Sequence, residues 1–340
     1  MHLRPILGAN PLTLRIERTS GRRRTRIRLS GEFRAGHIDQ VKAELRSARQ
    51  PVALDLAEVG LVDVESIRFL NACEANGIPA QHCSPYVRKW MSREQEEKEK
   101  RMESNVNVVL VHGAWADGSS WSKVIPLLQR KGLNVSAVQI PLTSLEDDIA
   151  VTRRILTAQK GLTVLVGHSY GGLVITGAAN GVANVQALVY IAAFALDEGE
   201  SIEALGKQGP PPAGAAAVRP DDHGFLWIDT HAFGKAFADD VDPTEAAVMA
   251  AVQKPLSVYS FATKSGPPAW KHIPSWYMVA TDDQMIPPPA EEFMAKRIGA
   301  TVKKVAASHA AMVSHPKEVA DLITLAVESV GKSVNTRVSR

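Results

Sequence analysis

Residues 164–172 read VLVGHSYGG. The apolar run at the start predicts a buried strand, and the apolar residues 173–179 that follow predict a helix. A Gly-x-Ser-x-Gly pentapeptide between a strand and a helix turns the chain so sharply that the serine hydroxyl projects above the sheet. A plain tight turn would account for Gly167 and Gly171 but not for the serine between them. We therefore expect Ser169 to be a nucleophile.

Strand and helix patterns alternate on both sides of this turn. The apolar run at 107–111 is typical of a parallel strand that is buried on both faces. Their order predicts an α/β fold with a doubly wound, mostly parallel sheet. The expected elements are strands at 107–111, 133–140, 162–167, 187–191, 275–280 and 301–305, and helices at 120–130, 145–158, 173–179, 290–298 and 317–327.

Two strand ends carry candidate partners for the serine. The strand expected at 275–280 runs into Asp283, and the strand expected at 301–305 runs into His309. A serine hydroxyl becomes a good nucleophile only when a base takes its proton and an acid orients that base. The 26 residues between the two candidates leave room for one helix and one strand. That is the step a triad in such a sheet requires.

Each partner has a rival nearby. His315 stands at the start of the last expected helix, where a capping or surface role suffices. Asp282 is the alternative acid, and we favour Asp283 because it lies nearer the loop. We thus expect the triad Ser169, Asp283 and His309.

Acyl transfer also needs donors for the oxyanion of the tetrahedral intermediate. The turn supplies one, the backbone N–H of Tyr170. The loop after the first strand supplies another, the N–H of Ala114, because Gly113 permits a close approach. His112 and Gly113 would alternatively form only a tight turn, but the two loops together favour the oxyanion site.

Several motifs in order carry a resemblance to a known family. Residues 109–115 read VLVHGAW, and Trp121, the GHSYG pentapeptide, the Asp283 strand end and the Ser308-His309 pair follow. In these features residues 105–332 resemble the α/β-hydrolase superfamily, specifically its small-esterase and hydroxynitrile-lyase branch. The resemblance implies the same triad, with Ala114 and Tyr170 as the oxyanion amides.

Two positions separate the chemistries within that branch. In the branch that this chain resembles, lyase members have a threonine at the position of Gly113 and a lysine at the position of Ala310. Neither residue is present. We therefore predict a serine hydrolase that cleaves an ester through an acyl-enzyme intermediate. A cofactor-independent peroxidase, perhydrolase or lyase stays open, because the same triad supports all of them.

Residues 196–271 interrupt the sheet pattern with prolines, glycines and short helical patterns, which predicts a cap inserted above the serine. No arginine cluster or carboxylate pair favours a charged substrate. We expect a small, uncharged carboxylic ester as substrate, and neither a metal nor an organic cofactor. Aromatic side chains of the cap either line an apolar pocket or pack the cap on the sheet: Phe225, Trp227, Phe233, Phe237, Tyr259 and Phe261.

A charged stretch divides the chain. Residues 91–104 read MSREQEEKEKRMES and have almost no apolar side chains, so we expect a solvated, partly helical linker outside any core. It separates an N-terminal domain at 1–90 from the hydrolase-like domain at 105–332. A tail follows at 333–340.

The N-terminal domain has strand and helix patterns of its own, which predict a small α/β layer structure. Residues 52–70 read VALDLAEVGLVDVESIRFL. They resemble the STAS domain of sulfate transporters and anti-sigma-factor antagonists, over roughly residues 12–95. That resemblance implies a phosphorylatable serine directly after Asp63, where Val64 stands. Ser66 is a displaced candidate, although a serine near a helix start with no regulatory role is the simpler interpretation. The expected elements are strands at 12–18, 24–30, 52–56 and 78–82, and helices at 64–75 and from 85.

Composition and charge exclude other classes. With 45% apolar and 22% charged residues, the chain is neither disordered nor collagen-like. Its apolar runs fall short of the roughly 18 residues of a membrane-spanning helix. Residues 1–104 carry 19 basic and 14 acidic side chains, hence +5, but no aromatics interleave with the arginines, so no nucleic acid is expected as a partner. Without a secretory h-region, the default location is cytoplasmic.

A second function class must be weighed against the enzyme. A hydrolase fold can lose its chemistry, so the alternative is a non-catalytic or sensing regulator whose N-terminal domain docks a protein partner. The intact set of Ser169, Asp283 and His309 favours the enzyme.

Overall fold

A computed structural model describes residues 14–21, 24–48, 51–103 and 106–338. The chain divides into two compact units, one of Met1–Arg101 with Asn335–Arg340 and one of Met102–Val334. Each unit has a hydrophobic core of its own. Over these described ranges, every helix is too short or too polar to cross a bilayer.

Six strands of the larger unit form one parallel sheet, in the order β13-β12-β8-β7-β5-β6. All residues of β5 and β12 are buried, as expected for strands covered on both faces. The mostly parallel sheet predicted from the sequence is thus confirmed. The strands are β5 (Val106–Val111), β6 (Asn134–Val138), β7 (Leu162–His168), β8 (Val185–Ile191), β12 (Ser275–Ala280) and β13 (Thr301–Val305).

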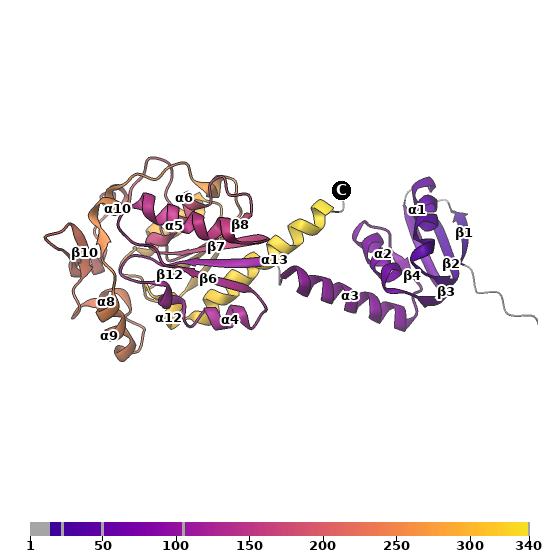
Figure 1. Ribbon diagram of the computed structural model, residues 1–340, viewed down its shortest axis with the longest axis horizontal. Helices are drawn as coiled ribbons and strands as arrows, with labels where there is room; N and C mark the ends of the chain where they lie inside the picture. Colours follow the sequence, from indigo (N-terminus) through magenta and orange to yellow (C-terminus); the bar gives the residue numbers. More distant parts are fainter. Residues whose placement is uncertain (1–13, 22–23, 49–50, 104–105, 339–340) are drawn as a thin grey trace, which may run out of the picture. The chain divides into compact units, whose positions relative to one another are not determined.

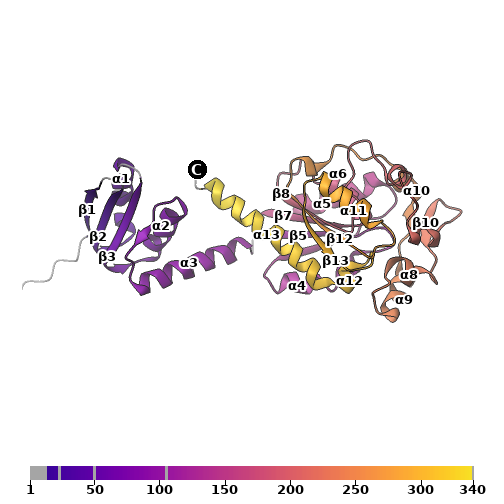
Figure 2. The ribbon, with the colours of Figure 1, turned by 180° about the vertical axis from the view of Figure 1, so that it is seen from behind.

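Helices cover both faces of this sheet. One face carries α5 (Leu145–Ala158), α6 (Tyr170–Ala178) and α11 (Pro288–Arg297). The other carries α4 (Ile125–Gln129), α12 (Ala311–Ser314) and α13 (Pro316–Val338), as Figures 1 and 2 show.

The helix expected at 120–130 is shorter than the apolar pattern predicted. A 3-10 turn, η2 (Gly118–Trp121), comes first, and α4 begins only at Ile125. Pro126 lies in the first turn of α4, where its missing N–H costs nothing. A longer helix would have placed this proline in the interior.

The cap expected at 196–271 consists of short elements, of which β10, α8, α9 and α10 lie together at one end of the large sheet (Figure 1). Three of its strands pair antiparallel in the order β11-β10-β9. The elements are α7 (Ile202–Gly206), η3 (Ala213–Ala217), β9 (Val218–Pro220), β10 (Phe225–Ile228), α8 (Phe233–Phe237), α9 (Pro243–Val252), β11 (Leu256–Ser257), α10 (Val258–Ala262) and η4 (Ala269–Lys271).

The smaller unit has a four-stranded sheet in the order β1-β2-β3-β4, in which only β1 and β2 pair antiparallel. Along β2, Ile27 and Leu29 are buried while Arg26 and Arg28 are partly exposed, so the arginines form a solvated face. The elements are β1 (Arg15–Ser20), β2 (Thr25–Phe33), η1 (Ala35–His37), α1 (Ile38–Ser47), β3 (Val52–Val62), α2 (Val64–Ala75), β4 (Ala80–Gln81) and α3 (Pro85–Glu103).

The expected linker at 91–104 differs from the structure in two ways. Most of it belongs to the continuous helix α3, because long charged side chains are good helix formers and pair at helical spacing, as Arg93 and Glu97 do at 3.1 Å. Met91, expected outside any core, is 2% exposed and packs in the core of the smaller unit.

The turn before α2 bears on the displaced phosphorylation site. Asp63 is the N-cap of α2 and accepts hydrogen bonds from the N–H groups of Ser66 and Ala35, each at 2.8 Å. The side chain of Ser66 is fully buried. A modifying enzyme could not reach this hydroxyl without opening the helix.

Candidate active site

Ser169 lies in a strained turn between β7 and α6. Its φ of 52° and ψ of −122° place it in a backbone region that residues with a side chain rarely adopt. A Cβ atom on Gly167 would lie 2.5 Å from the Gly171 carbonyl oxygen, and one on Gly171 would lie 2.6 Å from the His112 oxygen. Both glycines are therefore needed for the close approach of three chain segments at the serine.

The structure brings Ser169, His309 and Asp283 into one hydrogen-bonded chain. His309 Nε2 lies 2.8 Å from Ser169 Oγ, and His309 Nδ1 lies 2.5 Å from Asp283 Oδ2. Since the ionised carboxylate can only accept, the Nδ1 proton donates to Asp283 and leaves Nε2 free to accept from the serine hydroxyl. All three side chains are buried, with Ser169 4% exposed.

The position of the acid follows from the end of β12. Asp283 Oδ1 accepts from the N–H groups of Met285 and Ile286 at 2.6 and 2.9 Å. Burial opposes the charged form of Asp283, but His309 and these hydrogen bonds hold the pKa of its carboxyl below its usual value. Its rival, Asp282, is exposed to solvent.

The rival base lies elsewhere. His315 Nδ1 lies 2.9 Å from Ser314 Oγ and 3.4 Å from a carboxylate oxygen of Asp240. The imidazole of His309, and not that of His315, is in contact with the serine.

Two backbone N–H groups lie beside the serine in the chain fold. Within the described part of the chain, neither the N–H of Ala114 nor that of Tyr170 donates a hydrogen bond to another residue. Gly113, next to Ala114, is in very close contact with the nucleophile, since a Cβ there would lie 2.8 Å from Ser169 Cβ. Both N–H groups that the sequence analysis expected as oxyanion donors thus have no acceptor among the described residues.

Two buried histidines lie next to the site, His168, expected from the sequence to pack under the turn, and His112, considered only as part of a tight turn. His112 Nδ1 donates to the Gly113 carbonyl at 2.8 Å, and its Nε2 accepts from the Ile140 N–H at 3.2 Å. His168 Nε2 donates to the His309 carbonyl at 2.8 Å. Burial lowers the pKa of His112 to about 4 and that of His168 to about 3, so both rings are neutral. Their hydrogen bonds fix the loop after β5 and the loop after β13.

The cap contacts both loops of the site. The ring of Phe237 packs against His309 with centroids 4.9 Å apart and planes at 80°. Asp240 accepts from the Ser308 N–H at 3.1 Å, and the carbonyl of Lys254 accepts from the Trp115 N–H at 3.0 Å. Of the other cap aromatics considered from the sequence, Phe233 stacks behind Phe237, and Tyr259 is 76% exposed to solvent.

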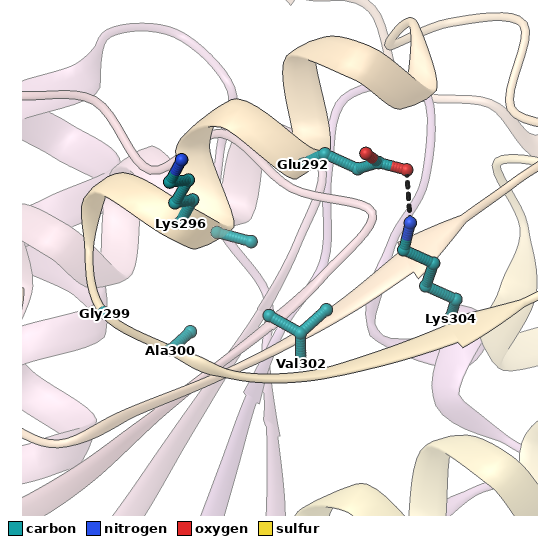
Figure 3. Close-up of a pocket in the computed structure, with 7 residues that line it drawn as sticks. Glu292, Lys296, Gly299, Ala300, Val302 and Lys304 are labelled. Carbon is teal, nitrogen blue, oxygen red and sulfur yellow. Dashed lines mark hydrogen bonds and ion pairs between the residues drawn. The ribbon is translucent and has the colours of Figure 1, made fainter.

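A hollow of about 540 Å³ lies at the edge of the large sheet, between α11 and β13 (Figure 3). No triad residue lines it. Its lining residues are Glu292, Ala295, Lys296, Gly299, Ala300, Val302 and Lys304. Over the described ranges, no group of three or more His, Cys, Asp or Glu residues is placed to hold a metal ion.

Comparison with known families gives a match over most of the larger unit. Residues 108–322 match the model of the alpha/beta hydrolase family. The chain belongs to this family. The α/β-hydrolase fold expected from the sequence is therefore confirmed, while the STAS resemblance of the N-terminal unit is a proposal only.

Curated relatives of this hydrolase are esterases and hydrolases. The carbendazim hydrolyzing esterase of Nocardioides sp. strain SG-4G is 34% identical over 119 residues, which span 31% of this chain and 49% of that protein. The pyrethroid hydrolase of Sphingobium wenxiniae is 25% identical over 250 residues, 64% of this chain and 86% of that protein. These relatives support the predicted enzyme class, a carboxylic ester hydrolase.

Solved structures resemble the larger unit. A pyrethroid hydrolase from Sphingobium faniae JZ-2 has a TM-score of 0.58 and 26% identity, over 66% of this chain and 98% of its own. Polyneuridine aldehyde esterase has a TM-score of 0.56 at 18% identity, over 64% of this chain and 97% of its own. The second likeness shows the fold alone.

Proposed function

We propose that this α/β-hydrolase is a serine esterase that cleaves a small, uncharged carboxylic ester. The continuous hydrogen-bonded chain from Ser169 through His309 to Asp283 carries the proposal. The free N–H groups of Ala114 and Tyr170 support it, because an ester develops negative charge on its carbonyl oxygen as the serine attacks.

The geometry supports a two-step reaction. Ser169 Oγ attacks the ester carbonyl carbon while His309 Nε2 takes its proton, and Asp283 stabilises the imidazolium. His309 then returns the proton to the alkoxy oxygen, the carbon–oxygen bond breaks, and the alcohol leaves an acyl group on Ser169. A water molecule repeats the sequence on the acyl group, which releases the acid and restores the hydroxyl.

The lack of space beside the proposed nucleophile favours hydrolysis over cyanohydrin cleavage. The expected lyase residues, threonine at 113 and lysine at 310, are replaced by glycine and alanine. Gly113 has no room for even a Cβ atom, because that atom would lie 2.8 Å from Ser169 Cβ and 3.0 Å from the His168 oxygen. A threonine could not stand there without moving the nucleophile.

The surroundings of the triad favour an uncharged substrate. The cap presents an apolar ring, Phe237, to His309. The two other imidazoles at the site, His112 and His168, are neutral because burial lowers their pKa values to about 4 and 3. Neither ring therefore carries a positive charge that could bind a negatively charged acyl group.

Ester hydrolysis is tested directly with p-nitrophenyl acetate. We expect saturable release of p-nitrophenol, and a fall of about a thousandfold or more in kcat for Ser169→Ala. A fluorophosphonate should label the wild-type chain on Ser169 and not label the variant. If the variant kept its activity, or the label mapped to another residue, the proposed nucleophile would be wrong.

We further propose that the N-terminal unit is a separate, STAS-like domain that docks a protein partner. Its strand order and the acidic turn before α2 support the resemblance. Val64 and the buried Ser66 do not support a phosphorylation switch. A pull-down that compares the full chain with a chain lacking residues 1–101 tests the docking, and equal capture by both would remove it.

A further inference from the structure

A second carboxyl group lies buried behind the triad acid. Glu291 on α11 is 0% exposed. Its neighbour Glu292 is exposed and pairs with Lys304 at 2.6 Å at the outer hollow (Figure 3). Two successive glutamates therefore point in opposite directions, one into solvent and one into the core beside the active site.

Glu291 is a close neighbour of the triad acid. Its Oε2 accepts from the Ala280 N–H at 3.0 Å. Its carboxyl group and that of Asp283 are close enough for each to act on the pKa of the other. No donor within the described residues reaches Oε1 of Glu291. Two ionised carboxylates repel each other and cannot hydrogen-bond, so a bond between these neighbours needs a proton on one of them.

The hydrogen bonds decide which group holds the proton. Asp283 accepts from His309, Met285 and Ile286, and all three bonds favour its ionised form. Among the described residues, Ala280 alone donates to Glu291. A carboxylate has about four acceptor positions, so Asp283 has one left for a proton donated by Glu291.

The electrostatic surroundings agree with this placement. The titratable groups that act on Glu291 are Asp283, Glu292 on its own helix, and Tyr277 from β12, whose hydroxyl donates to the Ala193 carbonyl. None of them is a cation. Burial and the negative charge of Asp283 raise the pKa of Glu291 well above its usual value.

We propose that Glu291 is a positioning residue that stays protonated and donates a hydrogen bond to Asp283, which fixes the carboxylate in line with His309. The inference rests on the proposed function, because the orientation of His309 has an effect only if Ser169 is the nucleophile. Glu291 touches neither substrate nor serine and acts through Asp283.

Two substitutions separate a neutral donor from a charge. In Glu291→Gln, the amide oxygen can accept from Ala280 and the NH₂ group can donate to Asp283, so we expect kcat/KM within about threefold of wild type and an unmoved acid limb of its pH profile. Glu291→Leu removes the donor, and we expect kcat to fall about tenfold to a hundredfold with KM little changed. Glu292→Gln, on the outer side of the same turn, is the matched control and should behave as wild type.

Three outcomes would overturn the inference. Wild-type kcat in a folded Glu291→Leu chain would show that Asp283 needs no support. An acid limb moved to lower pH in Glu291→Gln would show that a negative charge had been lost, since losing a nearby negative charge lowers a histidine pKa. Loss of activity in Glu291→Gln equal to that in Glu291→Leu would show that an amide donor cannot replace the acid.

Infrared spectroscopy tests the proton without using activity. We expect the carbonyl stretch of a protonated carboxylic acid in wild type at neutral pH, its retention in Glu292→Gln and its loss in Glu291→Gln. Absence of this band from wild type would overturn the inference, and this readout also decides the case if Glu291→Leu fails to fold. Because the band does not depend on catalysis, it is unaffected if Ser169→Ala shows the proposed function to be wrong.

Discussion

Gly113 is one of the glycines at which the proposed site has no space for a side chain. A Cβ atom there would lie 2.8 Å from Ser169 Cβ and 3.1 Å from His168 Nδ1. For Gly113→Ala we expect kcat/KM with p-nitrophenyl acetate to fall about a hundredfold, because a shift of about 1 Å in the nucleophile misaligns the attack. Gly266→Ala, where a Cβ meets nothing within 4 Å, is the control. Equal activity of both variants would contradict the tight contact.

His112 should make stability depend on pH. Burial lowers its pKa from the usual 6.5 to about 4 in the folded chain, so below pH 6.5 the unfolded chain binds the proton first. The contribution of His112 is therefore complete above pH 6.5 and is lost as the pH falls towards 4. The difference in unfolding free energy between wild type and His112→Asn should narrow by about 1.4 kcal/mol per pH unit, about 2 kcal/mol by pH 5. Urea unfolding between pH 7 and pH 5 measures it, and a constant difference would contradict the burial of a neutral ring.

Individual residues differ in how far the sequence could place them. Ser169, Asp283 and His309 each follow a predicted strand, and parallel strands end at one edge of a sheet, so their contact could be foreseen. Glu291 could not, because it and Glu292 are adjacent on one helix and only the packing of α11 on the sheet decides which one is buried. The choice between Asp282 and Asp283 likewise depended on the turn after β12.

At the scale of elements, the helix α5 is tied to the strained turn by one buried pair. Tyr170 Oη donates to Asp148 Oδ2 at 2.6 Å, and Asp148 Oδ1 accepts from the Leu142 N–H at 2.8 Å. Burial raises the pKa of Asp148 to about 6, although both hydrogen bonds oppose the rise. The carboxyl group of Asp148, which accepts from Tyr170 and from Leu142, thus links α5 to the start of α6.

Removal of the Tyr170 hydroxyl should weaken this link. In Tyr170→Phe, Asp148 Oδ2 loses its donor in a buried place, and we expect the free energy of unfolding to fall by about 1–3 kcal/mol. Urea denaturation measures the change. Tyr259→Phe, at a ring that is 76% exposed, is the control and should change stability by less than about 0.5 kcal/mol. A similar loss of unfolding free energy in both variants would show that the buried Tyr170–Asp148 hydrogen bond does not stabilise the fold.

Elements with a clear apolar period were predicted closely, and those set by tertiary contacts were not. The strands 275–280 and 301–305 and the helix 145–158 have the expected bounds. The helix α1 was not expected, since Val41 is its only buried residue. The strand expected at 52–56 continues to Val62, because it pairs with β2 through two irregularities in register that no local pattern shows.

At the scale of the whole molecule, two cores imply two cooperative units. We expect calorimetry to show two unfolding transitions. Leu54→Ala removes a fully buried side chain from the smaller unit. It should lower the free energy of unfolding of that unit by about 2–5 kcal/mol and shift its transition to a lower temperature. Leu165→Ala, equally buried in the larger unit, should lower the other. If each substitution moved both transitions together, the units would not unfold independently.

The cap bonds described at Asp240 and Lys254 have one more consequence. Ser169 is 4% exposed, so on the proposed function a substrate must displace part of the cap to reach it. The cap is hydrogen-bonded to the loops of the proposed base and of the proposed oxyanion donor Ala114. We therefore expect a movement of the cap to disturb both loops, and its return to restore them. If movement of the cap limits turnover, kcat should fall as the viscosity of the solvent is raised.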